Sequence, residues 1–94
     1  MGTIASLDID AQKGFTPLCP NELPVAGGAD IVAALNAQAA LANLRIGSKD
    51  AHPANAAWVV TSPAAMLQPL DLPNADLTWP AHCVPGTSGF ELLD

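Results

Sequence analysis

The order of regular segments in the first half of the chain constrains its fold more than any other feature. Residues 3–9 are short and partly β-branched, which predicts a first strand that ends at Asp10. Residues 29–43 are rich in alanine and carry apolar side chains at helical spacing, which predicts a helix with Asp30 as its N-cap. Residues 44–48 predict a second short strand. A strand, a helix and a strand in this order predict a βαβ unit with a parallel sheet, and hence an α/β fold.

The segments outside this unit have the composition of loops. Residues 11–28 contain three prolines and three glycines, and residues 51–90 contain six of the nine prolines. Within the second of these segments, residues 56–61 predict a short extended piece in an otherwise long loop. Inside the second strand, Arg45 and Gly47 weaken the strand pattern, because glycine is unfavourable in a strand interior. Long loops in compact domains are often functional, so we expect functional residues in the second half of the chain.

The charge balance argues against two classes of partner. The net charge is −6, and the three basic residues, Lys13, Arg45 and Lys49, form no run or patch. We therefore expect no nucleic-acid partner and no membrane partner. The sequence has no apolar stretch of bilayer-spanning length and no signal-peptide pattern at its start, which predicts a cytoplasmic protein. With 94 residues, half of them hydrophobic, the chain suits one small domain or a piece of a larger one. Its oligomeric state is left open, a homo-oligomer included.

The two histidines of the chain are the first candidates for chemistry. His52 follows Asp50 by two positions, and in an extended segment positions two apart point to the same side. The pair can then offer one carboxylate oxygen and one imidazole nitrogen to zinc, iron or manganese, with His82 as a third ligand from a separate loop. In the alternative interpretation, Asp50 caps a turn and His82 is a hydrogen-bonded loop histidine. The spacing alone leaves both interpretations open.

Candidate catalytic groups lie at the strand ends and among the cysteines. Asp10 and Asp50 follow the two predicted strands, at the edge where parallel sheets carry their sites. Asp10 either caps the turn that leaves the first strand or acts as a base that accepts a proton from a nucleophile. Asp8 is an alternative base, because strand alternation places both carboxylates on the same side. Cys19 and Cys83 are candidate nucleophiles, with a small buried apolar role as the alternative.

Four segments, in this order, resemble one enzyme family. Residues 10–15 (Asp-Ala-Gln-Lys-Gly-Phe) resemble the Asp-x-Gln-x-x-Phe that opens the cysteine-hydrolase family containing nicotinamidases and isochorismatases. Residues 23–29 resemble the entry to the first helix of that family, and residues 48–55 resemble its nicotinamidase metal segment. Residues 79–89 are the most specific, because they are similar to the nicotinamidase run Trp-Pro-x-His-Cys-Val-x-Gly-Thr-x-Gly. The resemblance implies an isochorismatase-like fold, in which a Rossmann-like parallel sheet forms the middle of three αβα layers.

The resemblance also implies roles for individual residues. Asp10 is implied to be the triad aspartate that takes the proton of the nucleophile. Asp50, His52 and His82 are implied to hold a divalent transition metal, with zinc favoured over iron and manganese. Isochorismatases of the same fold lack this metal set, so these three residues favour the nicotinamidase branch.

The implied substrate is a small planar amide. Phe15 and Trp79, which are otherwise candidates for the core, are implied to flank its pyridine ring. In this family the metal is thought to hold the ring nitrogen, directly or through water. The implied reaction passes through a cysteine thioester and releases ammonia, which converts nicotinamide to nicotinate and links the protein to NAD metabolism. Related amides such as pyrazinamide fit the same logic.

The chain also departs from the family pattern. Ala51 stands where the family usually has an aromatic residue, and Ala56 stands where many members have a further histidine. The catalytic lysine and the nucleophilic cysteine of the family come later than the Gly-Thr run, and neither Cys19 nor Cys83 matches the position of the nucleophile. We therefore expect residues 1–94 to be the N-terminal part of one hydrolase domain, with the lysine and cysteine on a companion chain. The alternatives are a non-catalytic metal- or ligand-binding remnant of the fold, and a related cysteine hydrolase with another amide substrate.

Overall fold

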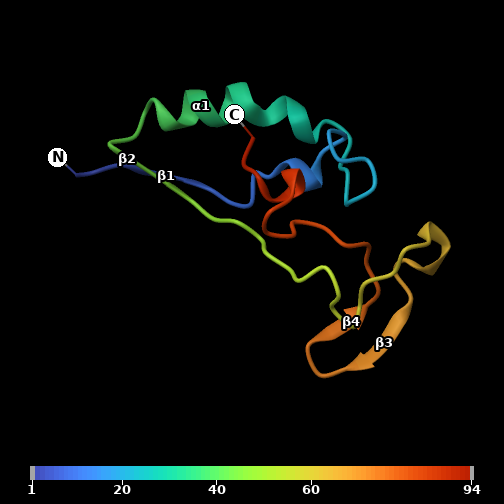
Figure 1. The fold of residues 1–94 in the computed structure, drawn as a ribbon. Coiled ribbons are helices and arrows are strands. Elements are labelled where there is room, and N and C mark those ends of the chain that lie inside the picture. The colour runs from blue at the N-terminus through green and yellow to red at the C-terminus, as the bar shows by residue number, and fades with distance from the viewer. Residues whose placement is uncertain (1, 94) are drawn as a thin grey trace.

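A parallel two-stranded sheet beside one α-helix forms the first half of the chain in the computed structural model, which describes residues 2–93 (Figure 1). Strand β1 (Ala5–Asp8) pairs with strand β2 (Leu44–Gly47), and helix α1 (Val32–Ala39) connects them and packs on one face of the pair. The predicted strand, helix, strand order and the parallel pairing are confirmed. These elements form an α/β fold. Among residues 2–93, no helix has the length and apolar character needed to cross a membrane.

The helix is shorter than the sequence predicts, and its predicted N-cap is wrong. Asp30 lies inside a 3-10 turn, η2 (Gly28–Ile31), and the residue that precedes the first turn of α1 is Ile31. Gly27, with a φ of 79°, adopts the left-handed conformation that starts this tight turn. The backbone N–H groups of Leu41 and Ala42 bond to carbonyls three residues back, so the chain tightens after Ala39 and the helix ends before the predicted residue 43.

The two faces of the β1–β2 sheet differ in polarity. On the face that α1 covers, Arg45 Nε donates to Asp8 Oδ2 at 2.8 Å and Arg45 Nη1 donates to Asn36 Oδ1 of α1 at 3.0 Å. Arg45, which weakened the strand prediction, therefore ties β1 and β2 to the helix. On the opposite face, leucine and isoleucine side chains are exposed to solvent, with 54 % exposure at Leu7 and 46 % at Ile46.

The second half of the chain contains a hairpin where the sequence predicts a long loop. Strand β3 (Pro69–Leu72) pairs antiparallel with strand β4 (Ala75–Leu77), and the hairpin lies at the end of the molecule away from α1 (Figure 1). The predicted extended piece at residues 56–61 forms one parallel bridge, between Val59 and Trp79. The strands are short and contain a proline, so composition favoured a loop although Leu70 and Leu72 do alternate.

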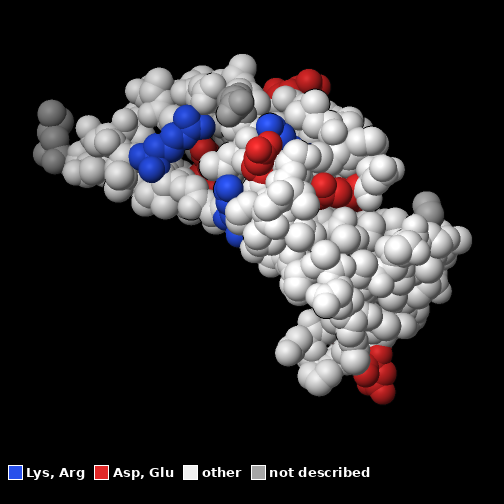
Figure 2. Space-filling model, viewed as in Figure 1, with Lys and Arg blue, Asp and Glu red and all other residues white. Residues whose placement is uncertain are grey.

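The last segment returns to the beginning of the chain. The 3-10 turns η1 (Lys13–Phe15) and η4 (Ser88–Phe90) lie in contact, and Gln12 forms an antiparallel bridge with Leu92. A further 3-10 turn, η3 (Pro63–Ala65), lies elsewhere, just before the hairpin. Figure 2 shows the few basic side chains separated by other residues on this side of the molecule, without a continuous basic patch. The most completely buried side chains, those of Gln12, Thr16 and Cys83, lie at this junction. The junction brings the segment after Trp79 next to the end of β1.

Candidate metal centre

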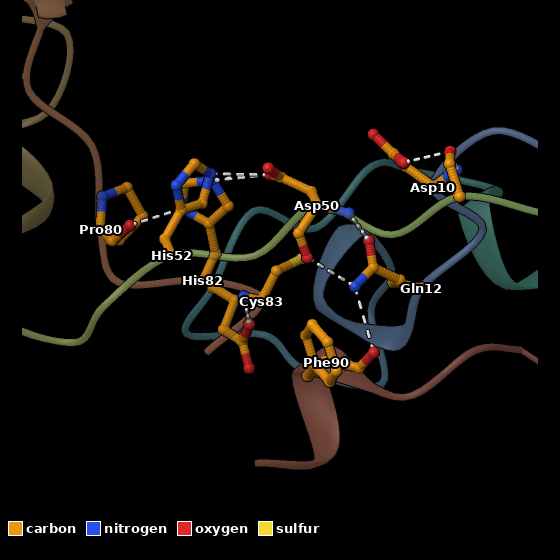
Figure 3. Close-up of polar contacts among 10 residues, drawn as sticks. Asp10, Gln12, Asp50, His52, Pro80, His82, Cys83 and Phe90 are labelled. Carbon is orange, nitrogen blue, oxygen red and sulfur yellow. Dashed lines mark hydrogen bonds and ion pairs between the residues drawn. The ribbon is translucent and has the colours of Figure 1, made fainter. Parts of the chain in front are cut away.

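Asp50, His52 and His82 converge beside this junction, as Figure 3 shows. His52 Nε2 lies 2.8 Å from Asp50 Oδ2, and His82 Nε2 lies 3.6 Å from the same oxygen. A hydrogen bond of 3.2 Å from the backbone N–H of His52 to the carbonyl of Cys83 joins the two segments that carry the histidines. Residues 30 positions apart are thereby held as one cluster, as the sequence predicted for a shared ion.

The orientation of His82 suits a metal ligand. Its Nδ1 lies 2.7 Å from the carbonyl oxygen of Pro80, and because a carbonyl only accepts, Nδ1 carries the proton. In the neutral ring this leaves the lone pair on Nε2, the nitrogen that faces Asp50. Metal-binding histidines are commonly held in this way, with the second ring nitrogen donating to a carbonyl.

The spacing of the three ligand atoms fits a transition metal. One atom from each residue lies within 4.8 Å of the other two. In a tetrahedral site with bonds of about 2.1 Å, two ligand atoms lie about 3.4 Å apart. The distances of 2.8 and 3.6 Å from Asp50 Oδ2 to the two histidine nitrogens are close to this value. Two imidazole nitrogens and one carboxylate oxygen suit zinc, iron or manganese, and three protein ligands leave coordination positions open.

Asp10 lies near the cluster but outside it. Its φ of 53° takes it out of the extended conformation of β1, so strand alternation does not place it on the side of Asp8. Its Oδ1 accepts a hydrogen bond of 2.6 Å from Ser48 Oγ, while Asp8 is paired with Arg45 under α1. Of the two candidate bases, only Asp10 is therefore free of a cationic partner among the described ion pairs.

Two tryptophans line a cavity of about 380 Å³ that opens onto His52 and His82. Trp79, predicted to flank the substrate, lines this cavity together with residues 74–77 of the hairpin and with Trp58. The Trp58 ring lies edge-on to His52, with 4.8 Å between centroids. Sequence reasoning missed Trp58, although the residue lies in the extended piece predicted at residues 56–61.

Phe15 lies on the other side of Trp79. It lines a neighbouring cavity of about 720 Å³, which Trp79 and Pro80 also border. Its ring centroid is 5.9 Å from that of His82. The structure therefore brings both predicted aromatic residues to the histidines, but places them along two adjoining cavities rather than around one.

The two cysteines are in different environments. Cys83 is fully buried, and burial, followed by the nearby negative charge of Asp50, Glu22 and Asp10, raises its pKa from 9.0 to about 12. Cys19 is partly exposed, with its Sγ 3.8 Å from Ser88 Oγ. Since the thiolate is the attacking form, Cys83 is unsuited to be a nucleophile at neutral pH.

This difference predicts selective alkylation. At pH 8, about one Cys83 thiol in ten thousand is ionised when its pKa is near 12, so we expect iodoacetamide to modify Cys19 and to leave Cys83 unmodified. Peptide mass spectrometry over a time course measures both sites. A denatured sample, in which both cysteines react, is the control, and modification of Cys83 first in the folded chain would contradict the structure.

Two polar residues that sequence reasoning did not single out hold the site in place. Gln12 hydrogen-bonds through its side-chain amide to the backbone N–H and carbonyl of Asp50 (Figure 3). Glu22 Oε1 accepts a hydrogen bond of 2.8 Å from the backbone N–H of Cys83, next to His82. Gly89 packs against the Glu22 carboxylate so closely that a Cβ there would overlap it. The signal for Gln12 was its place in the Asp-x-Gln segment.

Two known proteins are similar to this chain in sequence or in structure. The chain is 34% identical over 92 residues to a curated nicotinamidase of Acinetobacter baylyi. The match covers 94% of this chain and 42% of the relative. A solved structure of an Acinetobacter baumanii nicotinamidase and pyrazinamidase matches with a TM-score of 0.77 and 30% identity, over 94% of this chain and 43% of that chain. No family model matches the sequence.

The chain has an α/β fold of the isochorismatase-like type. Within this class, the chain is nicotinamidase-like in sequence and in structure over nearly its whole length. It spans less than half the length of the two relatives.

Proposed function

We propose that this chain forms the metal- and ring-binding part of a nicotinamidase, which hydrolyses nicotinamide to nicotinate and ammonia. The observation that carries the proposal is the convergence of Asp50, His52 and His82 on a cavity lined by Trp58 and Trp79. A cavity with aromatic walls and a few convergent polar groups suits a small flat ligand.

The donor set supports a resident divalent metal, with zinc as the first choice. Asp50, His52 and His82 would hold it, and the bound metal would supply a fixed coordination position for the nitrogen of a pyridine ring. Trp79 and Trp58 would then line the faces of that ring, and Asp10 would accept the proton of the attacking thiol. Binding of the ring nitrogen at that position would orient the carboxamide, and pyrazinamide, which carries an equivalent nitrogen, is a second expected substrate.

The proposed nicotinamidase activity can be tested by asking whether hydrolysis requires the ring nitrogen of the amide. We expect the assembled enzyme to hydrolyse nicotinamide and pyrazinamide, and to hydrolyse benzamide at least about 100-fold less efficiently in kcat/KM, because benzamide has the same shape without the nitrogen. Ammonia release, measured with all three amides on one preparation, gives the comparison. Equal efficiency with benzamide would overturn the metal-to-ring assignment, and no hydrolysis of any of the three would overturn the function.

We also propose that the lysine and the nucleophilic cysteine are supplied by a companion polypeptide. Parallel sheets are normally covered on both faces, whereas the face opposite α1 exposes Leu7, Ile9, Leu44 and Ile46 by 54, 64, 52 and 46 %. A companion that continues the sheet and covers this face would bury these side chains and bring a thiol to Asp10. Neither cysteine of this chain takes that role, since Cys83 is buried and protonated and Cys19 is not at the family position.

Intact mass spectrometry of active material tests whether a companion polypeptide is present. We expect two polypeptides to co-purify from cytoplasmic extract, the compartment in which we place the enzyme. A single species of this chain's mass, in a sample that still hydrolyses nicotinamide, would contradict the proposal.

A non-catalytic metal-binding protein is the second candidate, because all three proposed ligands lie within this chain. Bound metal without amidase activity and without a companion would favour it.

A further inference from the structure

The side chain of Gln12 is completely buried, with 0 % exposure, next to the proposed metal site. A buried primary amide is costly unless its donors and its acceptor are all bonded. Here Nε2 donates to the carbonyl of Asp50 at 2.9 Å and to the carbonyl of Phe90 at 3.1 Å, and Oε1 accepts from the N–H of Asp50 at 2.8 Å (Figure 3). Both amide hydrogens and the amide oxygen are therefore satisfied.

These three partners determine the direction of the amide. The N–H of Asp50 only donates, and the two carbonyls only accept, so Oε1 faces the N–H and Nε2 faces the carbonyls. A carboxylate in the same place would accept from Asp50 N–H but would set a negative oxygen against two carbonyl oxygens. The site thus requires glutamine rather than glutamate.

Gln12 continues the pairing of β1 and β2 beyond the strands. Asp8 pairs with Gly47, and the backbone N–H of Asp10 donates to the carbonyl of Ser48 at 3.2 Å. Gln12 and Asp50 each lie two residues beyond this pair. There the hydrogen bonds to the backbone of Asp50 come from the Gln12 side chain and not from a neighbouring backbone. Asp50 lies outside any helix or strand, so this side chain supplies the two-point attachment that a strand neighbour otherwise gives.

The carboxylate of Asp50 depends on where its backbone is held. Its Oδ2 is the oxygen that lies 2.8 Å from His52 Nε2 and 3.6 Å from His82 Nε2. His52 is anchored through its backbone N–H at the carbonyl of Cys83, and His82 is anchored through its ring Nδ1 at the carbonyl of Pro80. Displacement of the Asp50 backbone would therefore move the carboxylate relative to two histidines that are held by other groups.

We propose that Gln12 is a positioning residue that sets the geometry of the carboxylate ligand through the backbone of Asp50. The inference rests on the proposed function, because it presumes that Asp50, His52 and His82 bind a metal. It assigns to the glutamine of the Asp-x-Gln segment a role in metal geometry, whereas the aspartate of the same segment is proposed to handle a proton.

Cobalt(II) binding to the full chain, together with any polypeptide that co-purifies, tests this role. Gln12→Met keeps the length of the side chain and removes all three hydrogen bonds. We expect it to weaken Co²⁺ binding by about 10–100-fold, the usual effect of losing a group that orients a ligand. We also expect a changed visible absorption spectrum of the bound Co²⁺, because the ligand field depends on the position of the carboxylate. Loss of packing alone, with the cluster intact, would not change the spectrum.

Thr16→Val is the matched control. Thr16 is 1 % exposed, and its hydroxyl donates to the carbonyl of Lys13 and accepts from the N–H of Leu18, without contact to Asp50. We expect this variant to bind Co²⁺ with wild-type affinity and spectrum. A Thr16→Val variant with the same loss as Gln12→Met would overturn the inference, since any buried polar deletion nearby would then suffice.

The remaining outcomes separate the inference from the function on which it rests. A folded Gln12→Met variant with wild-type Co²⁺ affinity and spectrum would overturn the role of Gln12 and leave the metal site standing. A wild-type chain that binds no Co²⁺ would overturn both. If Gln12→Met does not fold, amide exchange in the wild-type chain decides: the Gln12 side-chain NH₂ should be protected with and without Zn²⁺, and rapid exchange would overturn the inference.

Discussion

Replacing His52 with alanine should remove stoichiometric metal from the protein. The change deletes one of the three proposed ligands and leaves Asp50 and His82 with too few donors to hold an ion tightly. We expect the affinity for Zn²⁺ to fall by more than the 10–100-fold that follows loss of a supporting hydrogen bond. Metal content after gel filtration, with Zn²⁺ titration by calorimetry, measures the loss.

The control for this variant separates ligation from packing. His52 also contacts the ring of Trp58, at 4.8 Å between centroids. Trp58→Ala removes that contact and keeps all three ligands, so it should retain about one metal ion per chain. Full metal content in His52→Ala would refute the assignment, and equal loss in both variants would show that packing of the cavity, rather than ligation, was responsible.

The site residues could be predicted to the extent that they follow from local sequence. Asp50 and His52 share a side because they are two positions apart, and His82 lies in a distinctive run. Their convergence was implied by the resemblance. The hydrogen bond between His52 and Cys83, which joins the two segments, is a long-range contact that no periodicity reports.

Residues that act through tertiary contacts escaped prediction for the same reason. Arg45 counted against a strand in the sequence, but in the folded chain it forms an ion pair with Asp8 and donates a hydrogen bond to Asn36. Trp58 lines the cavity beside Trp79, with which the next residue, Val59, forms a bridge. Pairing of segments 20 residues apart depends on the whole fold rather than on composition.

The boundaries of elements were predicted less well than their order. The parallel pairing of β1 and β2 was expected, while the helix was expected to begin at Asp30, a favourable N-cap residue. The left-handed Gly27 instead starts a 3-10 turn that includes Asp30, and α1 begins two residues later. Backbone conformation at one glycine thus overrode the side-chain preference of its neighbour.

Replacing Asp10 with asparagine should stop turnover and leave the metal bound. Asparagine keeps the shape of the side chain, tolerates the left-handed φ of 53° and can still accept the hydrogen bond from Ser48 Oγ. What it loses is the ability to take a proton from the thiol. We expect kcat of the assembled enzyme to fall by about 10²–10⁴-fold, the usual contribution of a general base. Ammonia release and metal content are measured on the same sample.

Asp8→Asn is the matched comparison, because Asp8 was the alternative base and lies two residues away on the same segment. Its Oδ2 is bound to Arg45 at 2.8 Å and its side chain faces α1, away from Trp79 and the cavity. We expect this variant to keep kcat within a few-fold of wild type, although loss of the ion pair can lower stability by up to about 1 kcal/mol. Turnover that survives Asp10→Asn but is lost in Asp8→Asn would reverse the assignment. Loss of bound metal in Asp10→Asn would mean that Asp10 supports the metal site rather than accepting a proton.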